Sequence, residues 1–162
     1  MAFLGMAECN AKGDVNVSKF KDRIAGCGGF INITQNTHKV VFCGTFTAKG
    51  LREEIRDGKL VITHEGAVQK FIDKVGQITF SAEYAHKHNQ QVMFITERCV
   101  FVLTDKGLVL TEIAPGMDLQ KDILDQMEFV PHIAENLKTM DERLFRDEPM
   151  GLVQDIFEQQ AG

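Results

Sequence analysis

The sequence predicts a mixed α/β domain dominated by strands and β-hairpins, with its helices late in the chain. Short apolar runs rich in Val, Ile and Phe recur between turn residues as far as residue 113, which is typical of strands. Asp57-Gly58 and residues 104–107 each interrupt such a stretch and predict a hairpin. A helical apolar stripe follows only after Pro115-Gly116.

The first part of the chain is expected to consist of strands and turns. Residues 2–8 predict a buried strand, and a turn at 10–14 leads into a short strand at 15–17. Residues 19–24 are polar and are expected to be irregular, while residues 30–33 fit either a strand or a helix.

The middle of the chain carries the clearest strand signals. Residues 39–45 predict a strand buried on both faces, because Val40, Val41, Phe42 and Cys43 follow one another. Residues 51–65 predict a hairpin near the surface, centred on Asp57-Gly58. The stretch 71–80 is expected to end in a strand, and residues 81–90 to form a polar segment.

The last part of the chain combines a second hairpin with the predicted helices. A strand is expected at 92–96, and a hairpin pairs 99–103 with 108–113. Asp118 is the predicted N-cap of a helix that reaches about Met127. Residues beyond 129 are expected to be irregular and charged, followed by a short helix near 152–157. We therefore divide the chain into a domain at 1–150 and a helical tail at 151–162.

The amino-acid composition limits the number of domains and the classes of protein to which the chain can belong. The 162 residues are 44% hydrophobic with a net charge of −5, which fits one domain and argues against nucleic-acid binding. No apolar run is long enough to cross a membrane, and a secretory signal is absent. The four cysteines form no Cys-x-x-Cys pair, so we expect reduced thiols in a cytoplasmic protein. The apolar opening residues fit a piece of a longer protein as well as a chain that starts here.

The glycine loop, residues 26–30, is the first candidate site. Glycines allow close approach to the main chain, and N–H groups at the start of a helix stabilise negative charge. The loop could serve as an oxyanion hole. The alternative is a tight turn packed against a neighbouring strand.

Other polar residues have weaker claims. Cys27 could be a nucleophile with His38 or His132 as its base, or simply a buried thiol. Glu65 could imitate a catalytic carboxylate, but an ordinary turn residue explains it. Asn16 could line a pocket or hold a turn, and Glu97-Arg98 is expected to be a surface pair. No metal site is expected, because no cysteine or carboxylate stands at metal-ligand spacing near the histidines. The histidines considered are His64, His86, His88 and His132.

Several motifs resemble the carboxyl half of class I coenzyme A transferases. They are the glycine loop Gly26-Cys27-Gly28-Gly29-Phe30 with 39–42, the run 96–101 with 107–116, and the opening residues 3–8 with 13–16. The resemblance implies a CoA-transferase (NagB/RpiA-like) fold. Its nearest branch looks like the acetate- or propionate-type enzymes. These move CoA between a short-chain acyl-CoA, including acetoacetyl-CoA, and a free carboxylate, through a glutamyl anhydride and a glutamyl-CoA thioester.

The resemblance also implies roles for individual residues. Gly28 and Gly29 would form the oxyanion loop, and the substrate-binding positions would be Gly26, Cys27, Phe30 and Asn16. The family's nucleophilic glutamate precedes the matching segment and has no equivalent here. The expected partners are therefore the missing amino-terminal half, acyl-CoA and a short-chain carboxylate, in a homo-oligomer, with coenzyme A as substrate and no other cofactor. Two alternatives stay open: a non-catalytic assembly or partner-binding domain, and a hydrolase that uses Cys27.

Overall fold

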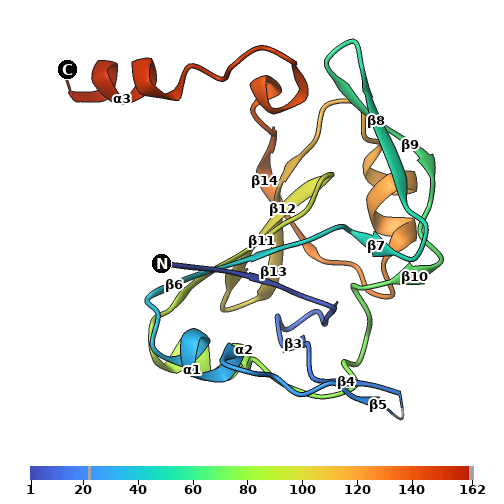
Figure 1. Cartoon of the computed structure of the whole chain (residues 1–162), viewed down its shortest axis with the longest axis vertical. Coiled ribbons are helices and arrows are strands. Elements are labelled where there is room, and N and C mark those ends of the chain that lie inside the picture. Colours follow the sequence, from blue (N-terminus) through green and yellow to red (C-terminus); the bar gives the residue numbers. More distant parts are fainter. Residues whose placement is uncertain (22, 161–162) are drawn as a thin grey trace.

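One six-stranded mixed sheet organises the chain, as the computed structural model shows for residues 1–21 and 23–160 (Figure 1). The strand order is β1-β6-β11-β12-β13-β14. β1, β6 and β11 run parallel, β11, β12 and β13 form an antiparallel meander, and β14 is parallel to β13. The strands are β1 (Ala2–Gly5), β6 (Lys39–Cys43), β11 (Gln91–Ile95), β12 (Cys99–Thr104), β13 (Gly107–Ile113) and β14 (His132–Thr139).

In the described residues, four two-stranded antiparallel ladders accompany this sheet. In the largest of them, Asp57 and Gly58 have φ angles of 50° and 72°, the left-handed values that a two-residue hairpin turn requires. The predicted hairpin is therefore confirmed, and it stands apart from the main sheet. The ladders pair β2 (Glu8–Cys9) with β3 (Val15–Asn16), β4 (Lys19–Phe20) with β5 (Arg23–Ile24), β7 (Thr47–Ala48) with β10 (Val68–Gln69), and β8 (Arg52–Arg56) with β9 (Lys59–His64).

The helices are short, and among the described residues polar side chains cap the start of three of them: Ser81, Asp118 and Asp141. The Ser81 hydroxyl accepts a hydrogen bond from the Tyr84 amide and caps α2. Asp118 accepts one from the Lys121 amide at 2.7 Å, which confirms the predicted N-cap. The segment that follows is a π-helical turn and a 3₁₀ turn instead of an α-helix. The helical elements are α1 (Phe30–Gln35), α2 (Ala82–Lys87), Leu119–Ile123, Leu124–Gln126, Glu142–Phe145 and α3 (Leu152–Gln160).

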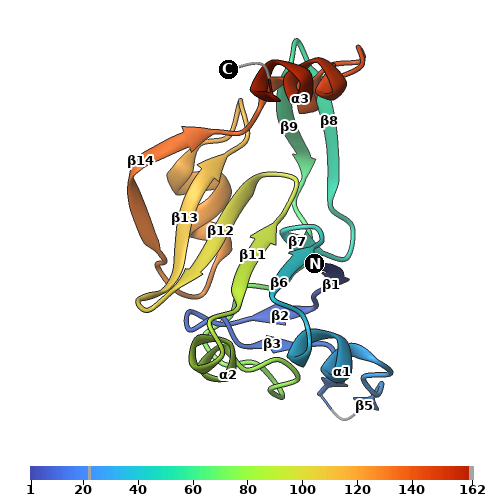
Figure 2. The same ribbon diagram turned by 90° about the vertical axis from the view of Figure 1, so that its left-hand side faces the viewer.

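The main core lies between the sheet and the two helices α1 and α2. Figure 2 shows these helices at one end of the molecule and the β8–β9 hairpin at the other. Phe42 of β6 is fully buried and contacts the rings of Phe30, Phe80 and Phe94 at centroid distances of 5.9, 5.1 and 5.1 Å. Val41 on the opposite face is also buried, so burial on both faces is confirmed for residues 40–42. The strand ends at Cys43, which is exposed, contrary to the prediction.

Some predictions for the first 90 residues are wrong. β1 ends at Gly5 and is not buried, since the side chain of Phe3 is 66% exposed. Residues 19–24 contain β4 and β5. Residues 71–80 form no strand and contribute only two isolated bridges, Cys9 with Phe71 and Val15 with Phe80. Residues 81–90 contain α2, whose buried face consists of Ala82 and Ala85. Helices are therefore not confined to the end of the chain.

The final third holds one further correction. Residues 132–139 form β14 instead of an irregular segment, although most of the strand is exposed. The predicted helix near 152–157 is present as α3, which extends away from the rest of the chain (Figure 1). An ion pair of 2.8 Å between Arg143 and Asp155 holds its first turn. Within the described part of the chain, no helix has the length and apolar character needed to cross a bilayer.

Candidate functional site

The glycine loop connects β5 to α1 and is anchored at its base. The amides of Ala25 and Gly26 both donate to the carbonyl of Ser18, at 2.8 and 3.2 Å. Gly26 and Gly28 have φ angles of 78° and 51°, which side chains rarely adopt, so glycine is required at both positions. Gly29 then serves as the N-cap of α1. Residues 30–33, whose sequence fits either a strand or a helix, belong to helix α1.

The main-chain amides of Gly28 and Gly29 have no acceptor among the residues that the structure describes. Both glycines are exposed. A Cβ added at Gly28 would meet no atom within 4 Å, and one at Gly29 would meet only the Ile33 side chain at 3.6 Å. The loop therefore presents, at the protein surface, two main-chain amides that have no described acceptor.

The three remaining site candidates lie at or beneath the loop. Phe30 is buried and stacks on Phe42, and half-buried Cys27 packs on the same core. Asn16 is fully buried, and its amide donates to Glu8 at 2.7 Å and to the Lys19 carbonyl at 2.6 Å. Its oxygen accepts from the amides of Ser18 and Lys19. Asn16 thus fixes the turn whose Ser18 carbonyl holds the loop.

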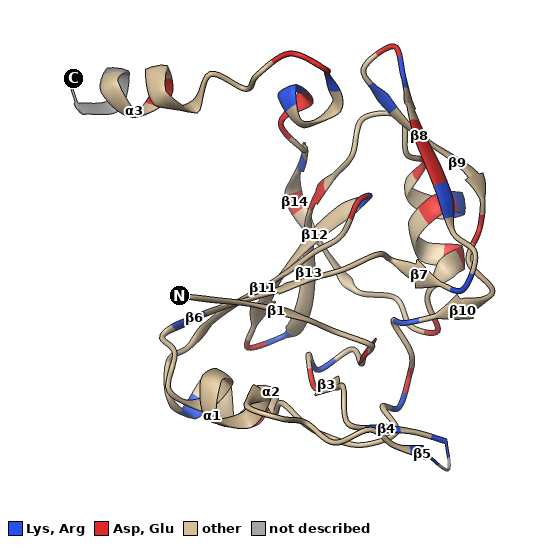
Figure 3. Cartoon of the chain, viewed as in Figure 1, with Lys and Arg blue, Asp and Glu red and all other residues tan. Residues whose placement is uncertain are grey.

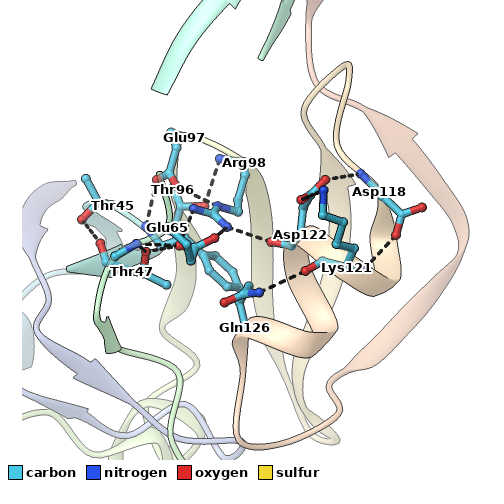
Figure 4. Close-up of polar contacts among 12 residues, drawn as sticks. Thr45, Thr47, Glu65, Thr96, Glu97, Arg98, Asp118, Lys121, Asp122 and Gln126 are labelled. Atoms are coloured by element: carbon cyan, nitrogen blue, oxygen red, sulfur yellow. Dashed lines mark hydrogen bonds and ion pairs between the residues drawn. The ribbon is translucent and has the colours of Figure 1, made fainter. Parts of the chain in front are cut away.

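A second polar region surrounds Arg98, and the expectation of a surface pair there is wrong. The Arg98 side chain is fully buried. Its Nε donates to Glu97 at 2.8 Å, and Nη1 and Nη2 donate to the two oxygens of Glu65 at 2.9 and 3.2 Å. Nη1 also donates to the Asp122 carbonyl at 2.8 Å (Figure 4). The guanidinium lies 4.9 Å from the centroid of the Phe46 ring.

The carboxylates of this Arg98 cluster have further partners. Glu97 accepts a hydrogen bond from the Phe46 amide at 2.8 Å, and Glu65 accepts one from the Thr47 hydroxyl. Burial raises the pKa of Glu65, but hydrogen bonds from Arg98 and Thr47 outweigh this effect, so the pKa lies below its ordinary value. Glu65 is therefore an ionised carboxylate engaged by two neighbours.

Lys70 extends the cluster toward the end of β6. Its ammonium group donates to the Thr45 carbonyl at 2.7 Å, and its side chain is buried. Burial lowers the pKa of Lys70, an effect that the nearby charge of Glu97 partly opposes. The cluster as a whole ties the segments after β6, β9 and β11 to the turn at 119–126. The Arg98 guanidinium and the carboxylates of Glu65 and Glu97 are hydrogen-bonded within the protein, so this cluster stabilises the fold. The glycine loop differs, because two of its amides have no described acceptor.

Sequence reasoning missed the burial of Arg98 because charge alone does not tell where a side chain points. One signal was available: the Glu97-Arg98 pair stands between two apolar strands, β11 and β12, with only Thr96 and no turn glycine in between. A charged pair inside such a short connection must lie close to the core.

The other candidates are not brought together. Cys27 lies beside α1, whereas His132 lies on β14 at the far edge of the sheet. His64 ends β9, and His86 lies on α2. The cysteines are free, and burial raises the pKa of Cys9 and Cys99 above that of an ordinary thiol. His132 on β14 therefore does not lie beside Cys27 and is not placed to act as its base.

Comparison with known proteins gives clear sequence relatives, although no protein-family model matches the chain. The chain is 53% identical over 153 residues to acetate CoA-transferase YdiF of Escherichia coli K12, covering 94% of this chain and 29% of that protein. It is 52% identical over 157 residues to caffeate CoA-transferase of Acetobacterium woodii, covering 94% of this chain and 30% of that protein. The chain thus spans less than a third of these curated relatives.

Solved structures agree with this result. The chain matches the apoenzyme of acyl-CoA transferase YdiF from Escherichia coli O157:H7 with a TM-score of 0.90 and 54% identity, covering 92% of this chain and 29% of that one. Glutaconate coenzyme A-transferase from Acidaminococcus fermentans matches with a TM-score of 0.62 and 14% identity, covering 97% and 56%. The second match shows a shared fold alone. The predicted mixed α/β fold class is confirmed.

Proposed function

The chain is homologous to one segment of the CoA-transferases, and we propose that it forms the carboxyl-terminal part of a transferase for short-chain acyl-CoA and free carboxylates. The sequence relatives support the reaction class. The acetyl-CoA and acetoacetyl-CoA preference is inferred from the motif resemblance described above. Coenzyme A enters as substrate, and the four free cysteines favour a reducing, cytoplasmic environment.

One observation carries the proposed mechanism: the amides of Gly28 and Gly29 donate to no described residue, and both glycines are exposed. Attack on a thioester or an anhydride creates a tetrahedral oxyanion, and two aligned N–H donors stabilise that charge. Removal of one such donor typically costs about 2.7–4 kcal/mol of transition-state stabilisation. We therefore assign the oxyanion loop to these two residues.

The substrate-binding role extends to the surroundings of the loop. Gly26 and half-buried Cys27 are proposed to line the substrate side, because they belong to the same turn as Gly28 and Gly29. Phe30 and Asn16 are buried and are proposed to support the substrate site from beneath. Their contacts with Phe42 and with the turn at Ser18 keep the loop amides in one orientation.

The attacking carboxylate must come from another part of the enzyme. Glu65 is held by Arg98 and Thr47, so its oxygens are already engaged. An oxyanion site without a nucleophile stabilises a state that never forms. We propose that a glutamate from polypeptide outside this chain attacks the acyl-CoA, and that the complete enzyme is a homo-oligomer.

A chimeric transferase tests this proposal. The matching segment of Escherichia coli YdiF is replaced by this chain, and transfer of CoA from acetyl-CoA to propionate is measured. We expect transfer well above that of the same chimera with Gly29→Val. A folded chimera that transfers no CoA would contradict the enzyme function and favour an assembly domain with the same fold. Circular dichroism and thermal unfolding establish that the chimera is folded.

A further inference from the structure

A small pocket lies beside the glycine loop, between α1 and residues 78–84. Its volume is about 200 Å³. Ile31, in its wall, follows the α1 N-cap Gly29 by two residues, which corresponds to about 3 Å along a helix axis. The pocket therefore begins within one helical turn of the loop amides. We call it the Ile31–Ile78 pocket, with walls that include Ile31, Thr34, Ile78, Thr79, Ser81 and Tyr84.

The pocket and the glycine loop are anchored to the same buried residue, Ser18. The Ser18 carbonyl accepts hydrogen bonds from the amides of Ala25 and Gly26 at the base of the loop. The Ser18 hydroxyl lies 2.8 Å from the hydroxyl of Thr79, in the wall of the pocket. The Thr79 amide also donates to the Val15 carbonyl at 2.8 Å. These contacts fix the pocket wall in relation to the loop.

The hydroxyl groups in the walls are already hydrogen-bonded within the protein. Thr34 donates to a main-chain carbonyl of α1 at 3.2 Å. Thr79 accepts from the Val17 amide at 3.2 Å, and Ser81 caps α2. Side chains that are engaged in this way offer few hydrogen bonds to a polar ligand.

The remaining walls are apolar and partly open to solvent. Ile31 is 37% exposed and Ile78 is 57% exposed. The Tyr84 ring stacks on His88 with a centroid distance of 3.9 Å, which holds the ring in place. Neither α1 nor the stretch 77–82 contains Lys, Arg, Asp or Glu (Figure 3). A phosphate or a free carboxylate would find no counter-charge on these elements, so the pocket favours a neutral apolar group.

We infer that the Ile31–Ile78 pocket receives the acyl chain of the acyl-CoA substrate and limits the length of that chain. This inference rests on the proposed function. The acyl chain is bonded to the same carbon as the oxygen that Gly28 and Gly29 would hold, so it must lie close to the loop. Pockets for drug-sized ligands measure about 300–1,000 Å³. A volume of about 200 Å³ therefore fits an acyl group of a few carbons and is small for an aromatic one.

The dependence of activity on chain length tests this inference in the chimeric transferase. Transfer of CoA to isotope-labelled acetate is measured from acetyl-, butyryl- and hexanoyl-CoA. One methylene in an apolar pocket changes kcat/KM by about 10–200-fold. Ile78→Ala widens the pocket, so we expect the ratio of kcat/KM for hexanoyl-CoA to that for acetyl-CoA to rise at least about tenfold. Ile78→Phe and Ile31→Phe narrow it and should lower the ratio of butyryl-CoA to acetyl-CoA at least about tenfold.

Ile24 offers a matched control. It lies on β5 just before the glycine loop, is 78% exposed and is not part of the pocket wall. Ile24→Ala and Ile24→Phe are expected to change both ratios by less than about twofold. All of these positions are at least one-third exposed, so thermal unfolding should show small changes in Tm. An active chimera in which the Ile78 variants behave like the Ile24 variants would overturn the inference.

Binding of an unreactive ligand separates the pocket from catalysis. S-butyl-CoA is a thioether without a carbonyl group, so a carboxylate has no acyl carbon to attack. Calorimetry compares its dissociation constant with that of CoA in the same chimera. We expect Ile78→Phe to weaken binding of S-butyl-CoA at least about fivefold and to leave that of CoA unchanged.

The outcomes distinguish this inference from the proposed function. A chimera that transfers no CoA but shows the difference between S-butyl-CoA and CoA would contradict the proposed function and support the pocket. Equal weakening of both ligands by Ile78→Phe would mean that the pantetheine arm occupies the pocket, which overturns the inference. Unchanged binding of both ligands would also overturn it.

Discussion

The Arg98 cluster and the glycine loop are both polar, yet their hydrogen-bonding groups are used in opposite ways. Arg98 is buried, and its guanidinium donates to Glu65, Glu97 and a main-chain carbonyl. The amides of Gly28 and Gly29 donate to nothing in the described part of the chain. Polar groups that are hydrogen-bonded inside the protein stabilise the fold, while donors without a described acceptor are available to a ligand. The comparison separates a region for stability from a region for chemistry.

The largest expected effect concerns the Arg98 cluster. Arg98→Met leaves Glu65 and Glu97 without their buried counter-charge, so we expect a loss of about 3–5 kcal/mol in the free energy of unfolding. Urea denaturation measures this loss. Arg143→Met is the control, because the ion pairs of Arg143 are exposed to solvent and should contribute far less to stability. Similar losses of unfolding free energy in both variants would show that the buried Arg98 cluster contributes no more to stability than the exposed ion pairs of Arg143.

The next effect concerns activity and leaves the fold intact. Gly29→Val places a branched side chain in front of the proposed oxyanion site, so we expect turnover of the chimeric transferase to fall about 100-fold or more. The φ of −82° at Gly29 is open to any residue, so stability should change by less than about 1 kcal/mol. Steady-state CoA transfer and thermal unfolding are measured together. Unchanged turnover would remove the loop from the mechanism.

A smaller effect follows from the lowered pKa of Glu65. Because the folded pKa lies below the unfolded value, the stabilisation is complete above the unfolded value, near about 4.3, and is lost as the pH falls through the folded pKa. We expect Glu65→Gln to be less stable than the unsubstituted chain at pH 7 and to lose less stability on acidification below about pH 4. Urea midpoints of both proteins between pH 7 and pH 3 test this prediction. If the midpoints of Glu65→Gln and of the unsubstituted chain change with pH in parallel, the prediction is contradicted.

The smallest effect distinguishes two adjacent glycines. Gly28→Ala forces a side chain into a left-handed conformation with φ of 51°, and we expect a loss of about 1 kcal/mol. Gly29→Ala at φ of −82° should be close to neutral. Chemical denaturation of the two variants compares them directly. A larger loss at Gly29 would mean that its contacts, and not its conformation, dominate this part of the loop.

Sequence patterns predicted those parts of the fold in which one local signal decides the structure. Asp57-Gly58 predicts its hairpin because both residues tolerate positive φ, and Val40, Val41 and Phe42 predict a covered strand. α2 was missed because a six-residue helix gives almost no periodicity. β14 was missed because it is exposed on both faces and therefore lacks an apolar pattern.

The two polar regions show the same limit. The glycine loop was recognised because glycines in a cluster are a local signal, and the helix after it is present. Its chemical role stays a prediction. The Arg98 cluster draws Glu65, Glu97 and the carbonyl of Asp122 from distant parts of the chain, and no local pattern encodes such a meeting.

The parallel pairing of β1 with β6 has a consequence for how the protein is made. Ala2 lies opposite Val40, and a parallel pair cannot be closed by a tight turn. β1 therefore leaves the ribosome seconds before its partner at a synthesis rate of about 5–20 residues per second. During that interval an uncharged apolar strand is free to bind a chaperone or another nascent chain. Yield in the cell should thus depend on translation rate and chaperone supply.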